Sequence, residues 1–206
     1  MSIPILHAPH GPKPRPVLAL AAGLSLARGR VHEICGRART TLAALILGQG
    51  KGPVIWISPA WQPERIFPGG LAALADPGRI IFAAARRPED VLWALEEALR
   101  SGVAPVVLAD LQSLPGLTPV RRLHLAAEAG ASTSGANAPL GLILTPENGG
   151  AQGVESRWHM APRLATSPHP TWHLSRLRAR MEPPAAWMVR HPPGGKTVFE
   201  PAPTAP

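Results

Sequence analysis

Short, wholly apolar segments recur along the first three quarters of the chain, and segments with helical spacing separate them. Five apolar segments predict strands: 31–35, 53–58, 79–85, 105–110 and 140–145. Between them, the spacing of apolar residues predicts helices over 40–47, around 71–74, over 88–101 and from 118 onward. Strands that are apolar on both faces and alternate with helices predict an α/β fold with a mostly parallel sheet flanked by helices.

The pattern changes after residue 154. Three short segments predict strands with no helices between them: 156–160, 171–178 and 186–190. They indicate an antiparallel C-terminal extension of the same sheet. Proline and glycine dominate from His191, which predicts a disordered, proline-rich tail over 191–206.

The N-terminal region combines a proline-rich segment, residues 1–16, with an apolar run over 17–26. Lys13 and Arg15 precede this run, as they would in a secretory signal, but the many prolines before it favour a helix that packs on the core. We therefore expect three parts: the segment 1–16, a core over 17–190 whose C-terminal strands start at about 155, and the tail 191–206.

Composition narrows the class of protein. The 206 residues suit one domain, and the 26 prolines and 20 glycines gather at the ends and at segment boundaries. The single cysteine excludes an internal disulfide and a four-cysteine zinc site. The histidines lack metal-ligand spacing, and no apolar run reaches the length of a membrane span. We expect a cytoplasmic protein without a metal site or a membrane partner.

The net charge of +8 comes from the two ends of the chain, because the first 35 residues carry +3, the last 56 carry +4 and the middle carries +1. Strand alternation would place Arg176, Arg178 and Arg180 on one face, near Arg157 and several tryptophans. Such a basic stripe could contact single-stranded DNA or a partner protein. An arginine-rich composition also arises simply from coding DNA that is rich in G and C, so the net charge alone does not show that the protein binds an acidic partner.

The turn after the first predicted strand of the core resembles a phosphate-binding loop that has lost its essential parts. Gly36 ends the strand, and Thr40 and Thr41 open the next helix, as in the pattern G-x-x-x-x-G-K-[ST]. Three loop residues, the second glycine and the lysine are missing, and Arg39 stands at the lysine position. Asp110 ends the fourth predicted strand, where nucleotide hydrolases of this topology hold magnesium.

Hydrolysis would also require a carboxylate after the second strand, to orient the attacking water. Ser58 and Ala60 occupy that region and cannot supply one, and Glu64 lies further along, behind a proline. We therefore expect no catalytic residue and no bound ATP or magnesium. Gly36, Arg39, Thr40, Thr41 and Asp110 are interpreted as the remnant of a nucleotide site.

The chain resembles RecA-type cores and, more closely, the ImuA family of bacterial damage-induced mutagenesis. The resemblance covers about residues 28–190 and rests on VHEICG at 31–36 with TTL at 40–42, on RRPEDVLWALEEALRSG at 86–102, on RRLHLAAE at 121–128, and on the tryptophans and arginines of the C-terminal strands. The stretch 86–102 is the most specific of these.

The resemblance implies a non-catalytic, RecA-like accessory protein in SOS-induced mutagenic translesion DNA synthesis, and hence in DNA repair. It would bridge an ImuB-like Y-family polymerase homologue and an error-prone polymerase III α-type subunit. Two alternatives remain open: a DNA-dependent ATPase that uses Arg39, Thr40 and Asp110, and a stand-alone module that binds single-stranded DNA.

Overall fold

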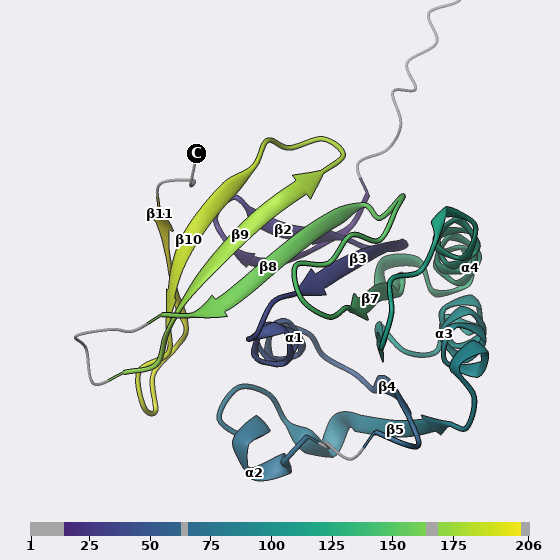
Figure 1. Ribbon diagram of the computed structural model, residues 1–206, viewed down its shortest axis with the longest axis horizontal. Helices are drawn as coiled ribbons and strands as arrows, with labels where there is room; N and C mark the ends of the chain where they lie inside the picture. The colour runs from purple at the N-terminus through teal and green to yellow at the C-terminus, as the bar shows by residue number, and fades with distance from the viewer. Residues whose placement is uncertain (1–14, 63–65, 164–168, 203–206) are drawn as a thin grey trace, which may run out of the picture.

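The computed structural model describes residues 15–62, 66–163 and 169–202 and is built around one sheet of nine strands (Figure 1). The strand order is β11-β10-β9-β8-β3-β7-β6-β4-β5. The strands of this sheet are β3 (Arg30–Cys35), β4 (Val54–Pro59), β5 (Ile80–Ala85), β6 (Val106–Asp110), β7 (Leu140–Leu144), β8 (Ser156–Pro162), β9 (Thr171–Ala179), β10 (Ala185–Arg190) and β11 (Val198–Ala202). The α-helices are α1 (Arg39–Gln49), α2 (Pro68–Leu71), α3 (Pro88–Ser101) and α4 (Leu117–Ser134), and short 3-10 turns lie at Pro77–Arg79 and Gly135–Asn137.

The pairing within this sheet confirms a mostly parallel core with an antiparallel extension. Neighbouring strands from β5 to β8 pair in parallel, and β8, β9, β10 and β11 pair antiparallel with one another. The parallel strands are joined through helices, because a parallel connection needs a crossover that returns the chain to the same end of the sheet. The carboxyl ends of β3, β4 and β6 therefore lie at one edge of the parallel half, where a ligand site is expected in such a sheet.

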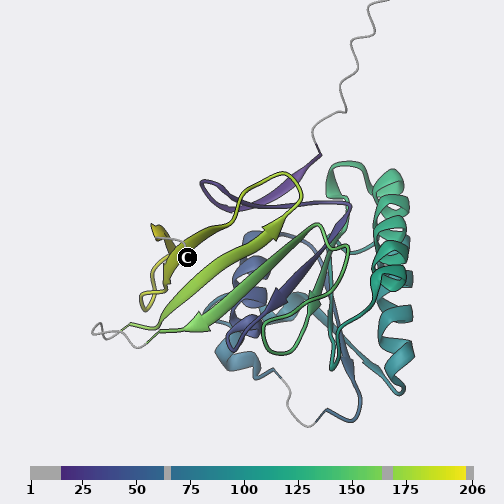
Figure 2. The same cartoon turned by 45° about the horizontal axis from the view of Figure 1, so that its top comes forward.

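Two apolar cores fill the two faces of the sheet. One packs α1 against β3, β6 and β7 and continues under the C-terminal strands through Trp158, Leu174 and Trp187. The other packs α3 and α4 against the opposite face through Val31, Leu95 and Leu123. Figure 2 shows α3 and α4 together on one side of the parallel strands, with the C-terminal strands extending away from them. Among the described residues, no helix has the length and apolar character to span a membrane.

The apolar run at 17–26 forms a two-stranded hairpin, so the predicted helix is wrong. Its strands are β1 (Val17–Ala21) and β2 (Leu24–Ala27), which pair antiparallel. Gly23 adopts φ +71° in the turn, a conformation that glycine adopts readily. Leu24 and Leu26 are buried at alternate positions, so the buried pattern of β2 has the period of a strand. The hairpin then covers part of the core beside α1.

The C-terminal tail is likewise ordered where disorder was expected. Residues 198–202 form β11, which pairs with β10 from Ala186 to Arg190. Because β11 is an edge strand, Pro201 can lie in it without removing a hydrogen bond from the interior of the sheet. Residues 203–206, and residues 1–14 of the proline-rich N-terminal segment, lie outside the described part of the chain.

The crossing of α4 over the end of α3 depends on Gly130. A Cβ atom at this position would lie 2.1 Å from the carbonyl oxygen of Leu99 and 3.0 Å from the ring of Pro139. Both obstacles are held in the fold by backbone, so neither can move aside at low cost. The absence of a side chain at Gly130 lets the two helices approach each other over the sheet.

We predict that Gly130→Ala destabilises the protein, although alanine is favoured over glycine in a helix by about 1 kcal/mol. Overpacking against backbone should outweigh that gain and lower the free energy of unfolding by about 2 kcal/mol. Urea denaturation would measure the change. Ser132→Ala, at an exposed position of the same helix, is the control and should stay within about 0.5 kcal/mol of wild type. A Gly130→Ala protein as stable as wild type would show that the contact is not tight.

Candidate functional site

The turn between β3 and α1, where a phosphate-binding loop would lie, is short and packed against β8. Gly36 has φ +90°, and a Cβ atom there would lie 2.4 Å from the Met160 carbonyl oxygen and 2.9 Å from the His159 ring. Gly36 is therefore required both by its backbone conformation and by the close approach of β8. The strand occupies the space on one side of the turn.

Three backbone amides of this turn already have hydrogen-bond partners within the protein. The Gly36 amide donates to the Glu147 carbonyl (2.7 Å), and the Ala38 amide donates to the Met160 carbonyl (3.0 Å). The Arg39 amide donates to the Gly36 carbonyl (3.1 Å). A phosphate-binding loop requires several amides that converge on the anion. These three amides are unavailable for that purpose.

The two charged residues of the predicted remnant face each other instead of a ligand. The guanidinium of Arg39 lies 3.9 Å from the Asp110 carboxylate. The other Asp110 oxygen accepts a hydrogen bond from the Gln62 amide (3.1 Å), and the Gln62 carbonyl oxygen accepts one from Gln112 (3.1 Å). Arg39, Asp110, Gln62 and Gln112 thus form a polar chain that joins α1 to the segments following β4 and β6. Sequence reasoning missed both glutamines, which no motif marks.

A cavity of about 590 Å³ adjoins this polar chain. Its polar lining comes from the predicted remnant residues and from the end of β4 and the segment after it, namely Arg39, Thr40, Thr41, Asp110, Ser58 and Gln62. Its apolar lining includes Trp56, Phe67, Leu71 and Phe82. Asp110 is the one carboxylate among the described lining residues, and Glu64 lies outside the described part of the chain. Large apolar walls suit an apolar group, and the Asp110 Oδ1 that lies 3.9 Å from Arg39 has no hydrogen-bond partner among the described residues.

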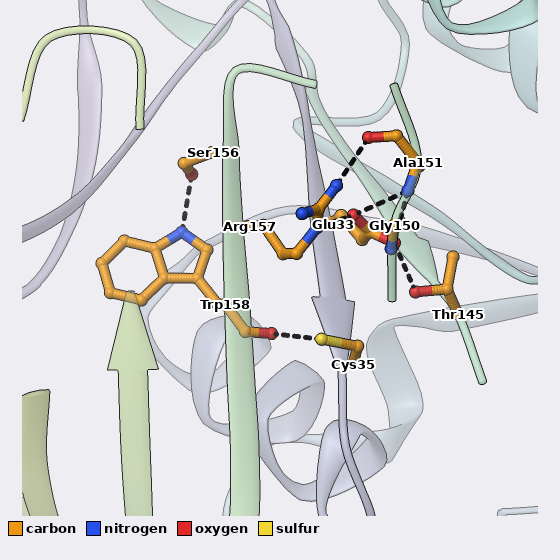
Figure 3. Close-up of polar contacts among 8 residues, drawn as sticks. All are labelled: Glu33, Cys35, Thr145, Gly150, Ala151, Ser156, Arg157 and Trp158. Atoms are coloured by element: carbon orange, nitrogen blue, oxygen red, sulfur yellow. Dashed lines mark hydrogen bonds and ion pairs between the residues drawn. The ribbon is translucent and has the colours of Figure 1, made fainter. Parts of the chain in front are cut away.

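A buried carboxylate on the other face of β3 organises the neighbouring loop (Figure 3). Glu33 is fully buried and accepts hydrogen bonds from the Thr145 hydroxyl (2.7 Å), the Gly150 amide (2.8 Å) and the Ala151 amide (3.1 Å). The Arg157 guanidinium, from β8, pairs with the same carboxylate and donates to the Ala151 carbonyl (2.8 Å). A buried charge is tolerated when it is paired and its remaining oxygens are hydrogen-bonded, as they are here.

The loop that surrounds Glu33 has an unusual backbone. Glu147, Gly149 and Gly150 have φ values of +52°, +69° and +150°. A Cβ atom at Gly149 would lie 2.6 Å from a Glu33 oxygen, so the loop can close around the carboxylate only with glycine there. Sequence reasoning missed this cluster. The available signal was a glutamate in the middle of a predicted buried strand, together with the paired glycines 149 and 150.

On the opposite face of β3, His32 belongs to a second buried polar group. Its Nε2 donates to the Ala27 carbonyl (2.9 Å), so its Nδ1 accepts from the Ser156 hydroxyl (2.6 Å). The Trp158 indole N–H donates to the same Ser156 oxygen (2.6 Å). Burial lowers the pKa of His32 to about 4, so the imidazole is neutral at physiological pH. His32, Ser156 and Trp158 therefore act together as a structural link between β3 and β8.

The predicted basic stripe does not form, because Arg176 points into the core. Its guanidinium lies 5.5 Å from the ring centroids of both Trp158 and Trp187. It also pairs with Glu182 and donates to the Pro183 carbonyl (3.0 Å). Cation–π contacts and an ion pair make this burial favourable, and they leave the charge unavailable to DNA.

The other predicted basic residues lie near one another, since Arg157 of β8 is the cross-strand partner of Arg178 of β9, but two of the three pair with carboxylates. Arg157 is held in the Glu33 cluster, and Arg180 pairs with Glu155 at 3.4 Å. Arg178 is exposed, beyond the residues at which β10 pairs with β9, and has no ion pair among the described residues. One free arginine from the four does not make a groove that could follow a nucleic-acid backbone.

Cys35, at the end of β3, is also structural. Its thiol is buried and donates to the Trp158 carbonyl (3.4 Å). Burial raises the pKa of Cys35 to about 12, so the reactive thiolate does not form at physiological pH.

Comparison with known proteins places the chain far from characterised relatives. No protein-family model and no curated protein matches it. Among solved structures, SulA from Pseudomonas aeruginosa is similar at 20% identity with a TM-score of 0.45, over 57% of this chain and 98% of the SulA chain. At this identity and TM-score, the likeness assigns neither a family nor a function.

The burial of His32 predicts a loss of stability in mild acid. Its folded-state pKa is lowered from 6.5, so its contribution is complete above pH 6.5 and decreases as the pH falls toward 4. At pH 5 the loss should be about 2 kcal/mol in the free energy of unfolding. Urea denaturation at pH 7.5 and pH 5 would measure it in wild type, in His32→Asn and in a control, His191→Asn. We expect only His32→Asn to reduce the difference between the two pH values; an unchanged difference in that variant would contradict the assignment.

The occupied amides predict that the protein does not bind ATP. Isothermal titration with magnesium-ATP at millimolar concentration should give no binding heat. Adding the nucleotide should leave the melting temperature of wild type unchanged, and likewise that of Asp110→Asn. Binding of magnesium-ATP that Asp110→Asn abolishes would show that the turn opens to make a functional site.

Proposed function

We propose that this protein is a non-catalytic, RecA-like accessory protein of SOS-induced mutagenic translesion synthesis, of the ImuA type. It would bridge an ImuB-like Y-family polymerase homologue and an error-prone polymerase III α-type subunit in the cytoplasm. The sequence resemblance over 28–190 motivates the proposal, and a parallel sheet whose first core strand, β3, leads into the phosphate-loop position is compatible with a RecA-like core.

The proposal that the protein is non-catalytic rests on the turn after β3, where amides already have hydrogen-bond partners. Its Gly36 and Ala38 amides donate to Glu147 and Met160, and Arg39 lies 3.9 Å from Asp110. An ATPase needs free amides for the phosphates and a free carboxylate for magnesium. The ATPase alternative has no support from this geometry, and the loss of the basic stripe equally weakens the alternative of a stand-alone DNA-binding module.

The surface supports a role in protein–protein contact. Several large apolar side chains are exposed on different elements, namely Phe67, Ile81, Phe82, Trp93 and Leu125. Exposed apolar groups of this kind are a common feature of binding surfaces.

Co-purification tests the proposal. The tagged full-length chain should retain the ImuB-like homologue and the α-type subunit, in equal amounts with and without magnesium-ATP. Arg39→Ala and Asp110→Asn, which change the nucleotide-site remnant, should retain the same amounts. Absence of a complex with either partner would refute the bridging role. ATP turnover that requires DNA and disappears in Asp110→Asn would establish the ATPase alternative.

A further inference from the structure

Strand β5 ends the sheet and lacks the features that normally protect such an edge. It pairs with β4 from Ile80 to Ala85, and no other strand of the described chain pairs with its outer side. All six of its residues are apolar, with no proline, no charge and no bulge in its pairing with β4. Natural edge strands usually carry one of these devices against pairing with another chain.

Two large side chains are exposed at the start of β5. Ile81 is 57% exposed and Phe82 is 54% exposed, and as successive strand residues they point to opposite faces of the sheet. An added strand would therefore cover apolar surface on both faces. It would also satisfy the free backbone groups of the edge.

We propose that the outer edge of β5 pairs antiparallel with β5 of a second copy of this chain, so that the two sheets become continuous across a two-fold axis. This inference goes beyond the proposed function and does not depend on it. The pairing is isologous, because the same strand contributes both sides of the interface.

The sizes of the side chains are self-complementary in an antiparallel arrangement. The first half of β5 holds Ile80, Ile81 and Phe82, and the second half holds three alanines, 83–85. Pairing centred on residue 83 sets Phe82 opposite an alanine at 84 and Ile81 opposite an alanine at 85, with matching faces. A parallel pairing in register would instead place each large side chain opposite the same residue of the other copy.

The charges at the two ends of β5 are also complementary. Arg86 and Arg87 follow the strand, are exposed, and have no ion pair among the described residues. Asp76 precedes it, is exposed, and uses one oxygen to accept the Gly78 amide (2.9 Å). In this register Arg86 and Arg87 of each copy lie opposite residues 80 and 79 of the other, at the end of the interface from which Asp76 precedes the strand.

The other charged residues near the ends of β5 do not cancel this attraction. Arg79 donates to the Leu47 and Gly52 carbonyls, which directs its guanidinium back toward the chain segment after α1. Glu89 and Asp90 lie in the first turn of α3, beyond the arginines, where they favour the amino end of that helix. One short strand is a small interface, so we expect a concentration-dependent dimer.

Sedimentation velocity over a range of concentrations tests the dimer. Wild type should show a monomer–dimer equilibrium, and Ile81→Lys, which adds an edge charge, should raise the dissociation constant at least about tenfold. Leu125→Lys changes an equally exposed side chain on α4 and should leave the constant unchanged. Thermal melting would confirm that both variants are folded. Wild type that is monomeric throughout, or a dimer that Ile81→Lys does not weaken, would overturn the proposal.

A charge exchange tests the antiparallel register. Asp76→Lys and the double variant Arg86→Glu/Arg87→Glu should each dimerise more weakly than wild type, because like charges meet at both ends. When the two variants are mixed, opposite charges meet at both ends, and the heterodimer should regain approximately the wild-type dissociation constant. Mixed proteins that associate no better than each variant alone would overturn the antiparallel pairing.

Discussion

A single buried charge, the carboxylate of Glu33, constrains the centre of this fold. An ionised group in the middle of an apolar strand must find donors inside the protein. Those donors come from the loop after β7 and from Arg157 on β8, so satisfying one side chain holds β8 beside β3. The mixed sheet is thus joined, at the boundary between its parallel and antiparallel parts, by an ion pair as well as by backbone hydrogen bonds.

The same arrangement accounts for the occupied phosphate-loop position. The loop that closes around Glu33 presents the Glu147 carbonyl to Gly36, and the strand that carries Arg157 presents the Met160 carbonyl to Ala38. The buried ion pair therefore positions two carbonyl acceptors, and these accept hydrogen bonds from amides that a nucleotide would need. The proposed loss of anion binding follows from how this sheet is held together, in addition to the absence of a lysine.

The sequence was sufficient to predict the elements whose periodicity is local. The parallel strands, α1, α3 and α4, and the three strands from β8 to β10 were confirmed. The predictions were wrong where contacts between distant segments determine the structure. Residues 17–27 pair as a hairpin because alternate leucines reach the core, and β11 forms because β10 offers an edge for pairing. Arg176 was assigned to the surface because alternation cannot show that two tryptophans cover it. The remnant residues Arg39 and Asp110 were placed together correctly, but their glutamine partners carry no sequence signal.

Several arginines of this protein connect elements inside the fold. Arg157 joins β3 to β8, Arg176 fills the space between two indole rings, and Arg39 lies 3.9 Å from Asp110. Guanidinium suits these roles because it is planar, always charged and able to donate in several directions. An arginine that pairs with a carboxylate is already cancelled in the net charge of +8, so the excess positive charge lies on exposed residues without an ion pair among the described residues, such as Arg86, Arg87 and Arg178.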